Sequence, residues 1–302
     1  GVFFAYIGFD ALSVLSEETK NPEKTLPKGM IISLVLSTAI YIVLTLILTG
    51  IVDYRKFEGI GDPLSFIFAP QNANIPWMEF VVSVTAIVAI TTVLLVFQMG
   101  QPRIWMSMSR DGLMPKKFAE IHPKYKTPSF ATIITGVAVG LPILFTDKTF
   151  ILDFTSIGTI FAFVLVNGGI LLMPQKEKLK GRFHLPYINA KYIFPILFIS
   201  GLVGFYFWQP EFFHNLWNIT DEHEGEFRLS IIIFLIINLA LVVLSYLKNL
   251  SLIPLLGLTS CLYLLTGMTH NNWFWFGLWF IIGLGIYFFY GKKNSKLNPE
   301  NM

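Results

Sequence analysis

Long runs of apolar residues, separated by short polar segments, make up most of the chain. A helix that crosses a bilayer needs about 17–25 such residues. The run 77–108 is too long for one simple crossing, so its end is expected to project into the cytoplasmic layer. The polar stretch NPEKTLP, residues 21–27, is expected to be a link between two spans. The pattern predicts nine spans: a partial or broken one over 1–16, then 28–52, 77–108, 129–146, 153–173, 191–208, 229–247, 250–268 and 273–290.

The composition agrees with a polytopic membrane protein. Hydrophobic residues make up 54% of the chain and charged residues 14%, with a mean hydropathy of +0.63, whereas a soluble domain carries roughly 25% charged residues. The single cysteine, Cys261, lies in an apolar run and indicates neither a disulfide framework nor a metal cluster. The chain has no phosphate-binding loop, nucleophile elbow or HExxH motif. We therefore expect an all-α transmembrane bundle that is not an enzyme and has no cofactor, metal or nucleic-acid partner.

The basic residues predict the orientation in the membrane. If the loop after the first span is cytoplasmic, the inside segments hold 18 of the 22 lysines and arginines. The positive-inside rule favours this orientation, which places the C-terminus in the cytoplasm and the acidic loop 209–228 outside. The expected location is the plasma membrane, or the inner membrane in a bacterium. Residue 1 is glycine and lies within an apolar run, so we expect the chain to be the C-terminal part of a longer protein. The inside segments are 17–28, 103–128, 174–191, 248 and 292–302.

The opening stretch FFAYIGFD combines two features that disfavour a plain membrane helix, the glycine Gly8 and the carboxylate Asp10. Irregular backbone survives at membrane depth only where it lines a cavity or is covered by protein. A break at Gly8 would free the carbonyl groups of Phe4, Ala5 and Ile7, which could bind a cation or an ammonium group. Asp10 would begin the second half-helix, where the helix dipole favours its charge. The alternative is that Gly8 allows close helix packing and Asp10 caps a helix or pairs with a lysine.

Three blocks of sequence resemble one family of transporters. FFAYIGFDALSVLSEETKNPEKTLPKGM resembles the sixth helix and following loop of amino acid permeases of the cationic amino acid transporter type, in the amino acid–polyamine–organocation superfamily. QPRIWMSMSRDGLMPKKFAEIHPKYKTPSFAT resembles the segment after the eighth helix, and FTSIGTIFAFVLVNGG resembles the tenth. The resemblance implies a leucine-transporter-type inverted-repeat fold. Residues 1–175 would be its second repeat, helices six to ten with helix six broken, and 176–302 would be peripheral helices 11–14. Helices one to five would be missing from this chain.

The same resemblance implies roles for residues elsewhere. Thr91 and Thr92 correspond to hydroxyls that face the cation position, although hydroxyls in membrane helices often bond only to their own backbone. Phe97 corresponds to a residue that closes the pocket floor, where a bulky ring favours a small neutral substrate. Arg103 could close an inner gate with a glutamate of residues 17–18, or act only as a positively charged anchor on the cytoplasmic side.

Other polar residues are expected to be structural. Asn167 and Asn238 lie inside spans and are expected to form helix–helix hydrogen bonds, with a ligand contact as the alternative for Asn167. The Asp111–Gly112 pair, followed by Pro115, predicts a helix stop and a turn.

Taken together, the residues and the resemblance predict secondary active transport of an amino acid, as proton-coupled uptake of a small neutral one. Asp10 would be a protonatable or gate-orienting group. The expected partners are the substrate, the proton, the lipid bilayer and helices one to five. One alternative is a carrier of cationic amino acids or polyamines. Another is a membrane sensor or partner subunit that has this fold without transporting, and a third is a truncated gene product.

Overall fold

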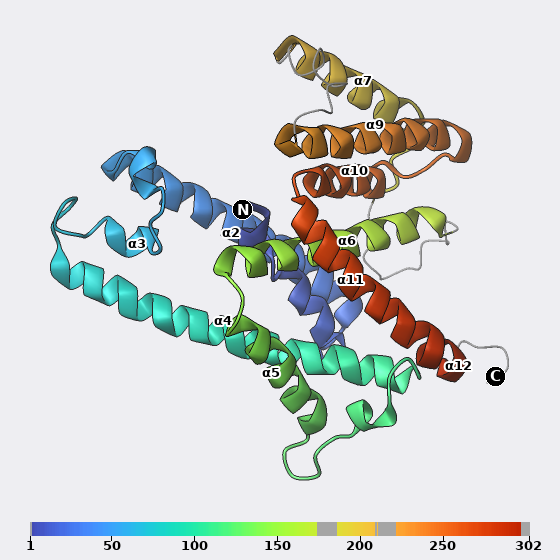
Figure 1. The fold of residues 1–302 in the computed structure, drawn as a ribbon, viewed down its shortest axis with the longest axis horizontal. Coiled ribbons are helices and arrows are strands. Elements are labelled where there is room, and N and C mark those ends of the chain that lie inside the picture. The colour runs from blue at the N-terminus through green and yellow to red at the C-terminus, as the bar shows by residue number, and fades with distance from the viewer. Residues whose placement is uncertain (1, 174–185, 209, 211–221, 297–302) are drawn as a thin grey trace. The chain divides into compact units, whose positions relative to one another are not determined.

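The computed structural model describes residues 2–173, 186–208, 210 and 222–296 (Figure 1). Every regular element in these ranges is a helix, and one isolated antiparallel bridge joins Asn189 to Ser251. The all-α prediction is therefore confirmed. The predicted inside segment 174–191 and outside loop 209–228 lie largely outside the described residues.

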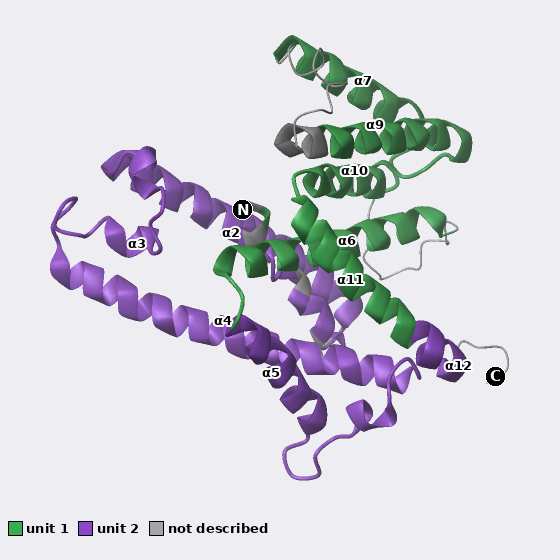
Figure 2. Cartoon of the chain, in the orientation of Figure 1, with its two compact units in different colours: residues 1–4, 145–286 green, residues 5–144, 287–302 purple. Residues whose placement is uncertain are grey.

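The chain divides into two compact units (Figure 2). Unit 1 comprises residues 1–4 and 145–286, and unit 2 comprises 5–144 and 287–302. The elements of unit 2 are η1 (Phe9–Glu18), α2 (Pro22–Ile51), η2 (Tyr54–Phe57), α3 (Pro63–Phe66), α4 (Pro76–Arg110), η3 (Lys116–Ala119), α5 (Ser129–Ile143), η4 (Tyr287–Gly291) and α12 (Lys292–Asn294). The elements of unit 1 are α6 (Lys148–Leu172), α7 (Ala190–Trp208), α9 (Glu222–Lys248), α10 (Leu252–Thr266) and α11 (His270–Ile286). The short helix α1 (Val2–Tyr6) crosses the division.

Six helices are long and apolar enough to cross a membrane, and they coincide with six of the predicted spans. The helices α5 and α10 have 15 residues each and are shorter than predicted. At 1.5 Å per residue each is about 22 Å long, against a hydrocarbon core of about 30 Å. The six are Pro22–Ile51, Pro76–Arg110, Lys148–Leu172, Ala190–Trp208, Arg228–Lys248 and His270–Asn294.

The segment 21–27, expected to link two spans, is mostly helical, because residues 22–27 form the first turns of α2. Asn21 has a φ of 52° and precedes the helix, which begins at Pro22. A proline is favourable at the first helical position since that N–H group has no helical partner anyway. Glu23, in the first turn, is favoured by the helix dipole.

The helix α4 ends where the sequence predicts a stop. Its 35 residues extend over about 52 Å, more than a bilayer core, so part of the helix projects beyond one. After the C-cap Asp111, Gly112 has a φ of 83°. The N–H of Gly112 donates to the carbonyl of Ser109 (3.1 Å), and that of Leu113 to Met108 (2.9 Å). This pair of hydrogen bonds is a Schellman motif, which satisfies the last carbonyl groups of the helix.

Unit 1 has two clusters of buried apolar side chains centred on α10. One joins α10 to α7 and α9, and the other joins it to α6 and α11. Leu255 is fully buried in the first cluster and Ile157 in the second. The first consists of Ala190, Phe194, Leu241, Leu252, Leu255 and Leu258, and the second of Ile157, Ile160, Cys261, Leu265 and Phe276.

Two asparagines within the spans of unit 1 behave differently. Asn238 is fully buried and accepts a hydrogen bond from the Thr259 hydroxyl (2.9 Å), which confirms the helix–helix bond predicted for it. The amide of Asn167 instead donates to the carbonyl of Phe163 in its own helix (2.8 Å), so the bond predicted there is wrong. Its neighbour on α10 is Gly257, which offers no side chain to bond.

Backbone pairing explains why α10 starts late. The N–H of Ala190 donates to the carbonyl of Leu250 (2.9 Å), and that of Leu252 donates to Ile188 (2.8 Å). These two bonds hold residues 250–252 extended beside the segment that leads into α7. The apolar run therefore enters the helix only at Leu252.

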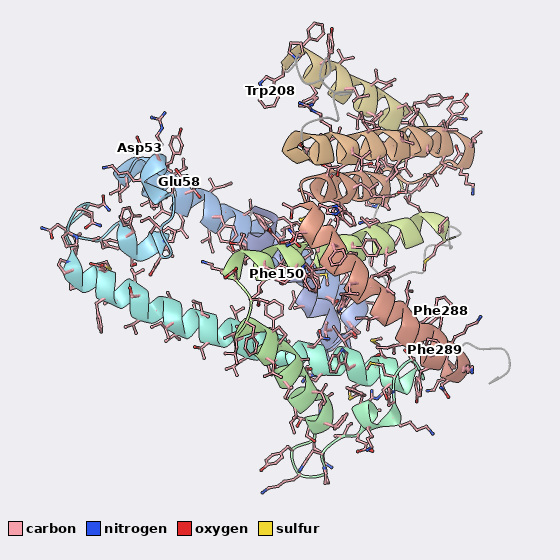
Figure 3. All side chains as sticks on the ribbon, viewed as in Figure 1. Asp53, Glu58, Phe150, Trp208, Phe288 and Phe289 are labelled. Carbon is pink, nitrogen blue, oxygen red and sulfur yellow. The ribbon has the colours of Figure 1, made fainter. Side chains whose placement is uncertain are left out.

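The surface is apolar along the helices and charged between them. The most apolar 18-residue windows of α2 and α4 bury none of their residues. In Figure 3, Trp208, Phe288 and Phe289 project from the ribbon, and they are 81%, 56% and 86% exposed. Asp53 and Glu58 lie in the connection after α2. Apolar exposure on this scale is unfavourable in water and suits a lipid or protein environment.

Candidate functional site

The first apolar run is interrupted at Ile7 and Gly8. The helix α1 ends at Tyr6, and the chain resumes as the 3-10 helix η1 at Phe9. Gly8 has φ 127° and ψ −21°, a conformation that residues with a Cβ atom adopt only with strain. The N–H of Ala11 donates to the Gly8 carbonyl (3.1 Å), which closes the first turn after the break. The interruption thus places non-helical backbone inside an apolar segment.

A tyrosine from α2 reaches the last turn before the break. The Tyr41 hydroxyl donates to the carbonyl oxygen of Ala5 (2.9 Å). Its ring packs edge-on against Tyr6, with centroids 5.5 Å apart and an interplanar angle of 84°. One of the three carbonyl groups considered for amine binding therefore already accepts a hydrogen bond. A carbonyl oxygen has two lone pairs, so an ammonium group could share it.

The aromatic ring of Phe97 lies next to the break. A Cβ atom at Gly8 would be 3.9 Å from the ring carbon Cζ of Phe97, an ordinary contact distance. Phe97 belongs to α4, which packs against η1 in unit 2. The structure thus brings together two candidate residues that are 89 positions apart in the sequence.

The two candidate threonines are held by their own helix. The Thr91 hydroxyl donates to the carbonyl of Ile87 (2.8 Å) and the Thr92 hydroxyl to that of Val88 (2.9 Å). Both side chains are exposed in this chain. A hydroxyl that donates its proton keeps its acceptor lone pairs, so this geometry is compatible with a cation position without requiring one.

Arg103 borders a small polar cavity between η1 and α4. Its Nη1 donates to the carbonyl of Met99 (3.2 Å), which holds the guanidinium group along the helix. The volume is about 260 Å³, enough for several waters at about 30 Å³ each. Serine residues of both helices contribute to its lining. The lining residues are Ser13, Val14, Ser16, Arg103, Ile104, Met106, Ser107, Met108 and Asp111.

Some candidate side chains lie outside the described part of the structure. The backbone of Phe4 belongs to α1, and Asp10 is the second residue of η1, but their side chains are not described. The same holds for the glutamates at 17–18, so the predicted partner of Arg103 is not placed. Among the described residues, no group of three or more His, Cys, Asp or Glu side chains could hold a metal ion.

Sequence reasoning missed three polar contacts within spans. The first is the hydrogen bond from the Tyr41 hydroxyl to the Ala5 carbonyl. In the second, the Gln98 amide on α4 donates to the carbonyl of Thr132 on α5 (3.0 Å). In unit 1, the amide of Asn272 on α11 donates to the carboxylate of Asp153 on α6 (3.1 Å). A carboxylate five residues after the start of an apolar helix, as at Asp153, is a signal that could have been followed. The partners of all three are distant in sequence.

The apolar helices and the interrupted first segment define an α-helical, multi-pass membrane protein with a broken helix, the device by which many transporters build their binding sites. The family model described as "Amino acid permease" matches residues 1–220, and that described as "C-terminus of AA_permease" matches residues 250–295. The chain belongs to the amino acid permease family, within the amino acid–polyamine–organocation superfamily. This is a family of transporters rather than enzymes.

Curated relatives differ in the substrate that they are named for. The chain is 31% identical over 298 residues to the branched-chain amino acid permease BcaP of Bacillus subtilis (strain 168), covering 98% of this chain and 50% of that protein. It is 30% identical over 300 residues to the methylthioribose transporter of the same organism, with the same coverage. It is 36% identical over 172 residues to the vacuolar cationic amino acid transporter 4 of Arabidopsis thaliana, covering 57% of this chain and 28% of that protein. The chain thus spans about half the length of the first two relatives.

Proposed function

We propose that this chain supplies one side of the substrate pocket of a secondary active transporter of amino acids. The observation that carries the proposal is the break at Gly8 with the ring of Phe97 against it. The rest of the pocket would come from helices outside this chain, since the chain spans about half of its relatives. Under this proposal residues 1–175 form the second inverted repeat, helices six to ten, and residues 176–302 form peripheral helices 11–14.

The carbonyl groups before the break would bind the amine of the substrate. Those of Phe4, Ala5 and Ile7 lie in the last turn of α1 and the turn after it, where the negative end of the helix dipole favours a cation. Asp10 follows the break and would be the protonatable or gate-orienting group. Placing a carboxylate in an apolar membrane segment costs free energy, so its presence there favours a functional role.

Phe97 would set the size of the substrate. Its ring occupies the space next to the break, so a small neutral side chain fits best beside it. Thr91 and Thr92 would support the cation position, and coupling would be to protons. The runner-up is transport of cationic amino acids or polyamines, because several relatives are named cationic amino acid transporters.

The inner gate would be the polar cavity beside Arg103, closed by a glutamate of residues 17–18. The distribution of basic residues supports an orientation with this cavity and the C-terminus in the cytoplasm. The membrane would be the plasma membrane, or the inner membrane of a bacterium.

Uptake by the full-length protein in proteoliposomes tests the proposal. Radiolabelled alanine and arginine are compared with and without an inward proton gradient, in the absence of sodium. Alanine uptake that rises with the gradient is the expected result. Arginine uptake alone would favour the runner-up, and transport of neither would favour a sensor or partner subunit with this fold.

A further inference from the structure

Two different faces of helix α4 make contacts within unit 2. One face lines the cavity shared with η1 through Ile104, Ser107 and Met108, and Phe97 lies on the same face about two turns before Ile104. The other face meets α5 and η3. There the Trp105 ring packs against Phe118 with centroids 5.2 Å apart. A rotation of α4 about its axis would move both faces together.

The contact between Gln98 and α5 restrains this rotation in the apolar part of the helix. The Gln98 amide donates to the carbonyl of Thr132 (3.0 Å). The facing surface of α5 is made of small residues: Ala131 is fully buried, Thr135 is buried, and Gly136 leaves room for the amide. A Cβ atom at Gly136 would lie 3.7 Å from the Gln98 Nε2. Small residues let membrane helices approach closely, and side-chain hydrogen bonds then fix their register.

We infer that Gln98 is a positioning residue for substrate size selection. Gln98 and Phe97 are consecutive, so their side chains leave the helix about 100° apart. Holding the Gln98 amide on α5 therefore aims Phe97 at the break. The inference rests on the proposed function for its consequence, because only a transporter converts the direction of the Phe97 ring into a choice of substrate. The orientation itself can be tested without transport.

The first experiment measures the orientation of position 97. In the full-length protein with Cys261 and all other cysteines replaced, Phe97→Cys is introduced and its reaction rate with a thiol reagent is measured. Gln98→Met removes the amide but keeps the length of the side chain. It should raise the rate by about threefold or more, the change expected from losing an average interhelical hydrogen bond in a membrane. Gln101→Met is the matched control, since the Gln101 side chain makes no hydrogen bond among the described residues.

The second experiment measures selectivity. Gln98→Met should raise kcat/KM for a large neutral amino acid relative to alanine, and this change should vanish when Phe97→Ala is also present. Gly136→Val, whose branches would displace the amide from the α5 side, should reproduce the effect of Gln98→Met. Gly136→Ala should not, because its methyl group meets the amide at an ordinary contact distance. If Gln98→Met fails to fold, Gly136→Val still tests the same contact from the α5 side.

The outcomes separate this inference from the proposed function. An equal effect of Gln101→Met, or a selectivity change that persists without the Phe97 ring, would show general loosening of α4 and overturn the inference. An unchanged labelling rate in Gln98→Met would overturn it as well. If the labelling rate rises while the wild-type protein transports no amino acid, the positioning role stands and the proposed function fails.

Discussion

Gly8 has a φ of 127°, so the interruption of the first apolar run depends on a residue without a side chain. We expect Gly8→Ala to abolish most transport, because the alanine would shift the backbone that holds the carbonyl groups of Ala5 and Ile7. Initial uptake rates at matched expression measure the effect. Gly50→Ala, in α2 with no atom within 4 Å of the new methyl group, is the control and should be close to wild type. Equal uptake by the two variants would contradict the role of the break.

Asp10 is the residue on which proton coupling is proposed to depend. Asp10→Asn keeps the size of the side chain but removes its titratable charge, so uptake in the complete protein should fall at least several-fold. Asp10→Glu keeps the carboxylate and should lose less. Initial uptake with an inward proton gradient, corrected for expression, gives the comparison. Unchanged uptake in Asp10→Asn would remove this residue from the mechanism.

Phe97 is proposed to limit the size of the substrate. Phe97→Ser removes the ring beside Gly8 and should widen acceptance toward larger or basic side chains. Competition of unlabelled amino acids against alanine uptake measures the profile. Phe80→Ser is a matched control on the same helix, since Phe80 is 70% exposed and should not affect the profile. A fixed profile in Phe97→Ser would mean that the ring does not line the pocket.

At the scale of helix packing, Gly257 of α10 lies directly against the Asn167 side chain of α6 in unit 1. A Cβ atom at Gly257 would lie 2.7 Å from the Oδ1 of Asn167, so either the Asn167 amide or the two helices would have to shift. Gly257→Ala should therefore destabilise the protein by about 1–3 kcal/mol, as overpacking typically does. The thermal unfolding midpoint in detergent should fall accordingly.

Two further variants decide whether that contact is the cause. Asn167→Ala in the Gly257→Ala background removes the opposing amide and should recover most of the lost stability. Gly283→Ala in α11 has nothing within 4 Å and should leave the midpoint unchanged or slightly higher. If Asn167→Ala did not restore the unfolding midpoint, the contact between Gly257 and Asn167 would not be the cause of the destabilisation.

An apolar run in the sequence predicts that a helix is present but not which helices pack against it. Its length identified each long helix, because in a membrane the backbone must form its hydrogen bonds internally. It could not identify neighbours, since helices that are apolar all round leave no distinct face. The partners of Gln98 and Tyr41 lie 34 and 36 positions away, so neither contact follows from local spacing. The late start of α10 could not be predicted for the same reason, because it results from backbone hydrogen bonds to residues just before and at the start of α7, which are distant in sequence.

The candidate site was accessible from the sequence only in its local part. Gly8 and Asp10 are conspicuous because each violates the pattern around it. The role of Phe97 at the pocket floor rested on a family resemblance alone, and its proximity to the break, 3.9 Å from where a Cβ atom of residue 8 would lie, had no signal in the sequence. The Tyr41 hydroxyl on the Ala5 carbonyl had a weaker signal, namely that a tyrosine inside an apolar helix needs a hydrogen-bond partner.

For the whole molecule, the two short helices α5 and α10 decide which connections lie on the same side of the membrane. The predicted orientation requires α5 and α10 to cross, although each helix is only about 22 Å long. If neither crossed, the C-terminus would stay on the same side, because two crossings would be lost. The connections between the two helices, including residues 174–191 and 209–228, would change sides. A reporter at the C-terminus therefore cannot distinguish the two arrangements.

Reporters inserted in those two connections can distinguish them. We expect an alkaline phosphatase fusion to be inactive within residues 174–185 and active within 211–221, because the first segment is part of an inside region with five basic residues and the second is acidic. A fluorescent protein after residue 302 should be fluorescent in either case and serves as the expression control. The opposite pattern of phosphatase activity would mean that the two short helices do not cross. The proposed repeat, which counts α5 as its ninth helix, would then have to be abandoned.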